Sequence, residues 1–211
     1  MTAQAVPDDE PRRAAHRPSR RLDIITAAIE VFSEKGFAEA SITDVAEKAN
    51  VVVSGVYYHF ETKAKLFDAA IAAVYESLDL AVEQARLGQE PGSSEALRCA
   101  IHAGNRWAED HPRASKMLYS QLPGATPGSA RLRVEHEARH VSAAYGYLQG
   151  AAALGSPTSP DSPAGELAAR TLVHLMISVM PLRLEGGPLS RRSPKSLDAS
   201  LQAVGHHIVF G

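Results

Sequence analysis

The chain has 211 residues, a formal net charge of −2 and one cysteine. This length suffices for a small domain plus a larger one, and the single Cys99 excludes an internal disulfide framework and suits a reducing compartment. The N-terminal segment is polar and basic and no apolar run reaches membrane-spanning length, so we expect a cytoplasmic protein with no membrane partner.

The first segment of the chain is basic and rich in proline. Residues 1–18 are therefore expected to form a disordered basic arm. Five arginines and no acidic residue occur between Pro11 and Arg21. In one interpretation the arm binds phosphate and enters a minor groove; in the other it is a solvated tail.

The next segment predicts a helix and then a sharp break. Apolar residues recur at three- and four-residue steps over 19–35, which is typical of a helix with one buried face. Gly36 predicts its end. Ser41 predicts the N-cap of a second helix, with Asp44 three residues later completing a variant of the capping box.

A tight turn and two further helices follow. Asn50 is expected in the turn, because asparagine tolerates left-handed backbone geometry better than most residues. A short helix is expected over 53–59, but Val52 offers no hydroxyl to cap it. Thr62 predicts the cap of a long helix over 63–86.

The rest of the chain is also expected to be helical. No alternating strand pattern appears, so the fold class is all-α. Turn-rich segments separate the remaining apolar stretches. The expected helices cover 94–110, 112–122, 129–154, 163–185 and 193–209.

Two short helices joined by a tight turn are typical of a helix-turn-helix unit that reads DNA. Three local patterns stand out in this region of the chain. They are Phe32, Gly36 and Phe37; the Thr-Asp-Val-Ala unit at 43–46; and the Tyr-x-His-Phe unit at 57–60. On these patterns the segment 20–70 resembles the DNA-binding domain of the TetR family of bacterial transcriptional regulators. The resemblance covers about a quarter of the chain.

The resemblance implies a domain organisation and a function. We expect the arm at 1–18, an N-terminal three-helix helix-turn-helix domain over 19–66, and a C-terminal helical ligand-binding and dimerisation domain over 67–211. The expected protein is not an enzyme and needs no cofactor. It is a ligand-responsive regulator, a repressor, that binds a palindromic double-stranded DNA operator as a homodimer and is released by a small-molecule effector.

The resemblance also implies roles for individual residues. Thr43, Tyr57 and Lys63 are expected to contact phosphate. The short helix over 53–59 contains no lysine or arginine and cannot make a bidentate arginine–guanine contact. Readout is therefore expected from polar, apolar and backbone groups that face or flank the major groove. These are Val53, Ser54, Gly55, Tyr58 and His59.

The last two expected helices are candidates for a dimer interface. The first of them is apolar on nearly every face, which requires burial on several sides. One interpretation is a four-helix interface with the partner; the other is that both helices complete the core of one chain. The interface candidates are Leu172, Leu175, Met176, Val179, Leu197, Leu201, Val204 and Ile208.

A ligand pocket is expected between the middle helices, with apolar walls and a few polar groups. Its composition indicates an amphipathic or aromatic ligand, with an anionic ligand as one alternative. The candidate wall residues are Trp107, Met117, Tyr119, Leu122, Tyr145, Tyr147, Met176 and Met180. The candidate polar residues are Arg106, Arg139, His102, His140 and His174.

One motif indicates a different chemistry. His136, Glu137 and His140 match the pattern H-E-x-x-H, in which two histidines chelate zinc and the glutamate acts as a base. Against it, Arg139 is charged, and a third ligand has to be guessed, with Glu166 as one choice. The alternative function is thus a zinc-dependent hydrolase or a metal-responsive protein, while the main prediction assigns no metal.

Overall fold

The computed structural model describes residues 20–119, 124–156, 158–183 and 187–211. Within these ranges the chain forms helices and no strand, which confirms the all-α fold class. None of the helices in these ranges is long and apolar enough to cross a membrane. The helices are α1 (Arg20–Glu39), α2 (Ile42–Lys48), α3 (Val53–His59), α4 (Lys63–Arg86), α5 (Ser94–Asp110), α6 (Pro112–Tyr119), α7 (Pro127–Ala153), α8 (Pro163–Arg183) and α9 (Pro194–Phe210).

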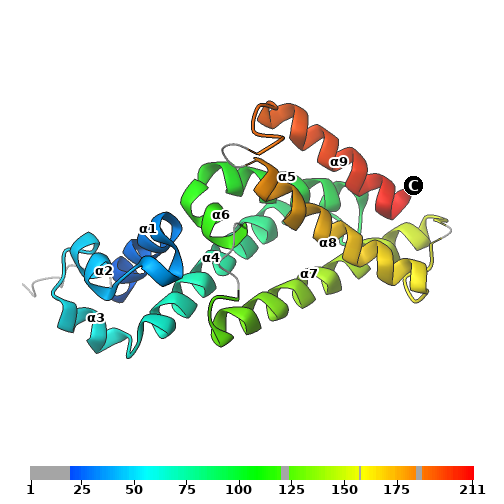
Figure 1. Ribbon diagram of the computed structural model, residues 1–211. Coiled ribbons are helices and arrows are strands. Elements are labelled where there is room, and N and C mark those ends of the chain that lie inside the picture. The colour runs from blue at the N-terminus through cyan, green and yellow to red at the C-terminus, as the bar shows by residue number, and fades with distance from the viewer. Residues whose placement is uncertain (1–19, 120–123, 157, 184–186) are drawn as a thin grey trace, which may run out of the picture.

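Figure 1 shows α1, α2 and α3 gathered at one end of an elongated molecule. The long α4 leads from that end into a larger bundle that contains α5, α7, α8 and α9 (Figure 1). The short α6 lies between the two groups and packs against α1, α5 and α8.

Local chemistry explains the breaks between the first helices. Gly36 has φ +77°, in the left-handed region that favours glycine, and kinks the end of α1. Ser41 Oγ accepts from the backbone N–H of Asp44 while the Asp44 carboxylate accepts from the N–H of Ser41, so the capping box is complete. Asn50 has φ +53° in the turn, as expected. Val52 begins α3 without a side-chain cap.

An aromatic core holds these helices together. Phe32 and Phe67 meet edge to face with ring centroids 5.0 Å apart, and Phe37 packs against both. Val56 is fully buried and Phe60 nearly so, which seats α3 on this core. The position of α3 is therefore set by buried apolar contacts on its inner face.

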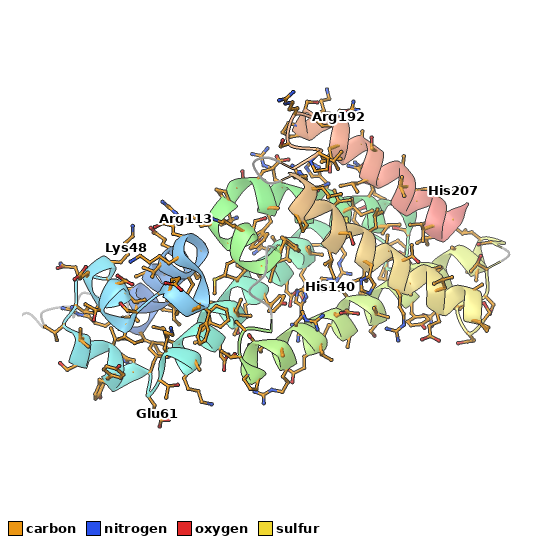
Figure 2. The ribbon with its side chains drawn as sticks, viewed as in Figure 1. Lys48, Glu61, Arg113, His140, Arg192 and His207 are labelled. Carbon is orange, nitrogen blue, oxygen red and sulfur yellow. The ribbon has the colours of Figure 1, made fainter. Side chains whose placement is uncertain are left out.

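The same core continues into the larger bundle through α4 and α6. Met117 and Leu118 of α6 belong to one buried cluster with Phe32 and Phe67. Arg113 of α6 pairs with Glu30 and Glu34 of α1 at 3.6 and 3.4 Å, and Figure 2 shows Arg113 at this junction. The helix-turn-helix unit thus packs directly against the larger bundle through α4 and α6.

A second buried cluster joins α5, α7, α8 and α9. Gly205 allows α9 to approach α5 closely, because a Cβ there would lie 2.5 Å from Ile101 Cδ1. His102 and Asn105 of α5 bind the Asp198 carboxylate of α9 at 2.8 and 2.9 Å. Apolar packing and this polar contact together fix α9 on the bundle.

Three of the expected helix boundaries need comment. Ser129 was expected to start a helix, but α7 begins at Pro127 because Thr126 is the N-cap and Ser129 is its capping-box partner. The expected ends of the helices over 112–122 and 163–185 fall partly outside the described residues, as does the arm at 1–18.

Candidate DNA-binding surface and effector cavity

The outer face of α3 is exposed although it carries large side chains. Tyr58 is 85% exposed and Tyr57 is 51% exposed, whereas Val56 between Gly55 and Tyr57 is completely buried. Val53 and Ser54 are also exposed. These exposed apolar and aromatic side chains are neighbours on one helix, and together they leave apolar surface in contact with water. The outer face of α3 is therefore suited to binding a partner.

The expected phosphate-contacting residues surround α3. Thr43 is exposed in the first turn of α2, where backbone N–H groups have no helical partner. The Lys63 ammonium donates to the carbonyl oxygens of Ala38 and Ala40 at 3.1 and 2.9 Å, which terminates α1. Lysine has three N–H donors, so one remains for a phosphate.

A hollow lies beside α3. Its volume is about 600 Å³, and Tyr58 and His59 line it together with the turn at Asn50. Arg20, the first described residue, lies at the same hollow. The described chain therefore begins next to the exposed face of α3.

A separate cavity of about 120 Å³ lies in the larger bundle, between α4, α5, α7 and α8. Its wall is mostly apolar, with Leu97 and Ile101 of α5 facing Leu172 of α8. Polar groups gather at two places. Arg86 donates to the Tyr147 hydroxyl at 3.3 Å, and His136 and His140 of α7 lie elsewhere on the wall. Figure 2 shows His140 on the inner side of α7.

The structure brings some of the expected pocket residues to this cavity. They are Tyr119, His140, Tyr147, Met176 and Met180. His174 lies at a neighbouring hollow of about 380 Å³ that shares Tyr119, His136 and Ile177 with the cavity. Leu122 falls outside the described residues.

Other expected pocket residues lie away from the cavity. Trp107 is buried in the core below and donates from Nε1 to Ser77 Oγ at 3.0 Å. Arg106 is on the surface and pairs with Asp110. The other expected pocket residues that do not line the cavity are absent from its wall for the same reason, since each side chain packs or pairs elsewhere. They are Met117 and Tyr145 in the packed clusters, His102 at Asp198, and Arg139 at Asp79.

Sequence reasoning missed Arg86 and Asp79. Both lie on α4 on the side that faces α7. A basic residue in the last turn of the expected long helix was a usable signal for Arg86, whereas nothing local marks Asp79.

Asp79, His136 and His140 converge on one point. Asp79 Oδ1 lies 2.9 Å from Nε2 of His136 and 2.9 Å from Nε2 of His140, and the two nitrogens are 3.0 Å apart. Asp79 Oδ2 accepts from Arg139 at 3.0 Å. Tyr75 stacks on the His136 ring with centroids 4.0 Å apart.

The surroundings shift the ionisation of these groups. Burial acts to raise the pKa of Asp79, but the hydrogen bonds from His136 and His140 outweigh it and hold that pKa well below its usual range. Burial lowers the pKa of His136, and this effect exceeds the opposing contact with Asp79. The carboxylate is therefore charged and the His136 ring favours its neutral form.

The arrangement does not match the alternative hydrolase chemistry. Glu137 pairs with His174 at 3.3 Å and with Arg133 at 3.9 Å. Glu166, the guessed third ligand, is exposed and pairs with Arg170, whereas the structure brings Asp79 to the two histidines. The spacing of the H-E-x-x-H pattern brings the two histidines together, and the residue beside them is Asp79 and not the guessed Glu166.

The expected interface residues divide between the core and the surface. Leu172 and Leu201 are buried within the chain. Leu175, Met176, Val179, Leu197 and Ile208 are half-buried against the second cluster, and Val204 is 46% exposed. α8 was expected to be buried on several sides, and in the single chain Leu167, Ile177 and Leu182 are exposed.

The helix-turn-helix region matches the family model for bacterial regulatory proteins of the tetR family over residues 24–70. This segment of the chain therefore matches the DNA-binding region of the tetR family. Among curated relatives, the probable acrEF/envCD operon repressor of Escherichia coli strain K12 is 28% identical over 107 residues, which are 51% of this chain and 49% of the relative. The match thus spans about half the length of that relative.

Solved TetR-family structures share the whole fold. A regulatory protein from Rhodococcus RHA1 superposes with a TM-score of 0.74 at 19% identity, covering 92% of this chain and 98% of that one. The transcriptional regulator FadR of Bacillus subtilis, solved in complex with stearoyl-CoA, gives a TM-score of 0.73 at 15% identity, covering 89% and 97%. At these identities the likeness shows the fold.

Proposed function

We propose that this protein is a dimeric, ligand-responsive transcriptional repressor that binds a palindromic operator. The proposal rests on the two faces of α3. On the inner face Val56 and Phe60 are buried in the core, whereas on the outer face Tyr57 and Tyr58 are exposed. The proposed domains are those expected from the sequence, with division at residue 66 inside α4. The buried cluster crosses that division, so α4 acts as a shared element.

The DNA contacts follow from the chemistry of the exposed groups. Tyr57, Thr43 and the remaining N–H of Lys63 bind phosphates and set the orientation of the protein on the duplex. Ser54 and His59 form hydrogen bonds to base edges, and Val53 and Tyr58 contact thymine methyl groups. Gly55 lets the backbone approach DNA closely.

The partner of α8 and α9 is a second copy of the chain. A palindromic site requires two reading heads related by a two-fold axis, with half-sites about 34–36 Å apart or a multiple of that. The exposed apolar residues of α8, together with Val204 of α9, supply a face for a four-helix contact. The buried Leu172 and Leu201 support that face from inside.

The dimer is tested by sedimentation of two matched variants. Val204→Glu places a charge in the interface and is expected to give monomers. Leu80→Glu is the control, because Leu80 on α4 is exposed to a similar extent, 55% against 46%. Dimers in both variants would remove α9 from the interface.

The cavity of the larger bundle is the effector site. Its apolar wall with Arg86 and Tyr147 at one place suits an apolar molecule with an acidic group. The stearoyl-CoA in the FadR neighbour has an apolar chain and an anionic part, which agrees with this polarity. A cavity of about 120 Å³ is smaller than typical drug-sized sites of about 300–1,000 Å³.

Because the cavity is small, an effector of ordinary size must separate its walls. Leu78, Val82 and Arg86 of the wall lie on α4, whose first turns pack in the aromatic core below α3. Binding therefore favours a position of α4 in which the two reading heads misfit the operator. The effector shifts the equilibrium only by its differential affinity for the two states.

The direct test is fluorescence anisotropy with DNA from upstream of the gene for this protein. We expect specific, salt-sensitive binding at one dimer per palindrome. Tyr58→Ala is expected to weaken specific binding, while Tyr145→Ala, at a distance from α3, serves as the control. Binding that never exceeds the non-specific level on a genome-wide fragment library would overturn the proposal.

A further inference from the structure

The cluster of Asp79, His136 and His140 is poorly explained by hydrogen bonds alone. A neutral imidazole has one N–H donor and one acceptor. If both Nε2 atoms donate to Asp79 Oδ1, two N–H groups crowd together, since the nitrogens are 3.0 Å apart. If one Nε2 atom instead accepts a hydrogen bond from the other, the accepting nitrogen carries no proton. It then has nothing to donate to the carboxylate oxygen beside it. Three electron-pair donors therefore face one point.

We propose that these three side chains bind a divalent transition-metal ion. Two imidazoles and one carboxylate suit zinc, nickel, cobalt or iron better than magnesium or calcium, which prefer all-oxygen sites. Octahedral bonds of about 2.1 Å place neighbouring ligand atoms about 3.0 Å apart. The observed separations are 2.9, 2.9 and 3.0 Å. The triangle therefore matches one face of a six-coordinate site.

The surroundings hold the ligands in this orientation. Arg139 engages Oδ2 of Asp79, which leaves Oδ1 directed at the histidines. Tyr75 stacks on His136 and fixes the plane of that ring. Such outer contacts orient the ligands of metal sites and contribute to affinity. The i, i+4 spacing of His136 and His140 on α7 makes the pair rigid before any ion binds.

The site opens toward space that a ligand can enter. His136 lines both the cavity and the neighbouring hollow, and His140 lines the cavity. Three protein ligands leave positions for further donors on the ion. An anionic group of the effector coordinates the ion while the apolar body of the effector lies against α5 and α8. This role of the effector rests on the proposed function.

The ion would also join two helices that matter for DNA binding. Asp79 is on α4 and the histidines are on α7. Nearer the helix-turn-helix unit, Thr126 at the start of α7 donates to the Asp68 carboxylate of α4. A metal at Asp79 adds a second fixed point between the same helices, so it biases the position of α4.

Metal binding is tested on the full chain without DNA. The protein is freed of metal with EDTA, transferred to chelator-free buffer, and titrated with Zn²⁺ or Ni²⁺ in competition with a chromophoric chelator. We expect one ion per chain and a higher unfolding temperature with metal. Asp79→Asn and His140→Gln are expected to weaken binding by at least about 100-fold, more than loss of an outer contact.

The matched control is His102→Gln. His102 belongs to another histidine–carboxylate contact, with Asp198, and that pair lacks a second histidine. This variant is expected to bind metal as the wild type does. Equal affinity in all variants, or no ion retained against the chelator, would overturn the site. Circular dichroism of each metal-free variant confirms that the fold is intact.

Cobalt reports the geometry and the open positions. The Co²⁺-loaded protein is expected to show the weak visible bands of six-coordination, and azide is expected to change them by entering an open position. A spectrum that azide leaves unchanged would exclude open positions. DNA titrations in EDTA test the regulator separately, so failure of the metal site and failure of the proposed function are distinguished.

Discussion

Beneath α3, Phe32, Phe37 and Phe67 fill the space between α1 and α4, whereas the larger bundle leaves a cavity between α5 and α8. The first region keeps one shape, so that the exposed face of α3 is presented in a fixed orientation. The second region keeps empty space and places charged and imidazole groups on its wall. A close-packed core holds the DNA-binding face in one orientation, whereas a core with a cavity can accept an effector and change shape.

The largest effect is expected from opening the filled core. Phe67→Ala removes a fully buried ring and is expected to reduce the free energy of unfolding by about 3–5 kcal/mol. Met176→Ala is the comparison, because Met176 is only half-buried and borders the cavity. Its expected cost is about 1–2 kcal/mol. Denaturant unfolding measures both, and equal losses would contradict the contrast between the regions.

The same contrast explains what the sequence could predict. The helix-turn-helix unit depends on short-range chemistry: Gly36, the Ser41–Asp44 capping box and Asn50 all act within a few residues. The capping box and the turn at Asn50 were predicted and confirmed, whereas Gly36, predicted to end the first helix, kinks α1, which continues to Glu39. The roles of the exposed α3 residues toward DNA remain predictions.

The cavity depends on contacts between distant segments. Trp107 was expected in its wall but donates to Ser77 in the core, and Arg86 was missed although it binds Tyr147. Apolar periodicity shows which face of a helix is buried but not which neighbour it meets. The metal cluster shows the same limit, since the histidines are four residues apart while Asp79 is 61 residues from His140.

A sharper test of the reading face uses base preference. Ser54→Ala and His59→Ala are each expected to cost about 1–3 kcal/mol at the base pair contacted and little at others. Anisotropy against single-base operator variants measures the preference. Uniform weakening across all of these operators would mean that neither side chain reads a base.

Lys63 tests whether one residue serves both structure and DNA. Lys63→Ala removes the donor to the carbonyls of Ala38 and Ala40, with an expected loss of about 1 kcal/mol in unfolding free energy. It is also expected to reduce the salt slope of DNA binding by about one unit. The control is Lys65→Ala, because Lys65 lies two residues further along α4 and is exposed. An unchanged slope would leave Lys63 with the structural role alone.

The smallest effect separates local from distant electrostatics. Lys35, followed by the backbone and side chain of Ser41, lowers the pKa of Asp44 to about 2. At Asp198, burial acts to raise the pKa, but hydrogen bonds from His102, Asn105 and Gln202 outweigh it and hold the pKa below its usual value of 3.8. The first set lies within one helix-turn-helix unit; His102 and Asn105 belong to α5, far along the chain.

A depressed carboxylate pKa stabilises the fold above the unfolded value and loses that contribution as pH falls through the folded value. Asp198→Asn should therefore destabilise the protein at pH 7, by up to about 1 kcal/mol, because Asn105 is buried in this network while His102 is largely exposed. The gap from wild type should begin to narrow below about pH 3.8 and should close as the pH falls through the folded value. A gap that stays constant across unfolding curves at pH 7, 5 and 3 would mean that the α5–α9 contact depends on shape rather than on charge, which would make Gly205 the more important element of that junction.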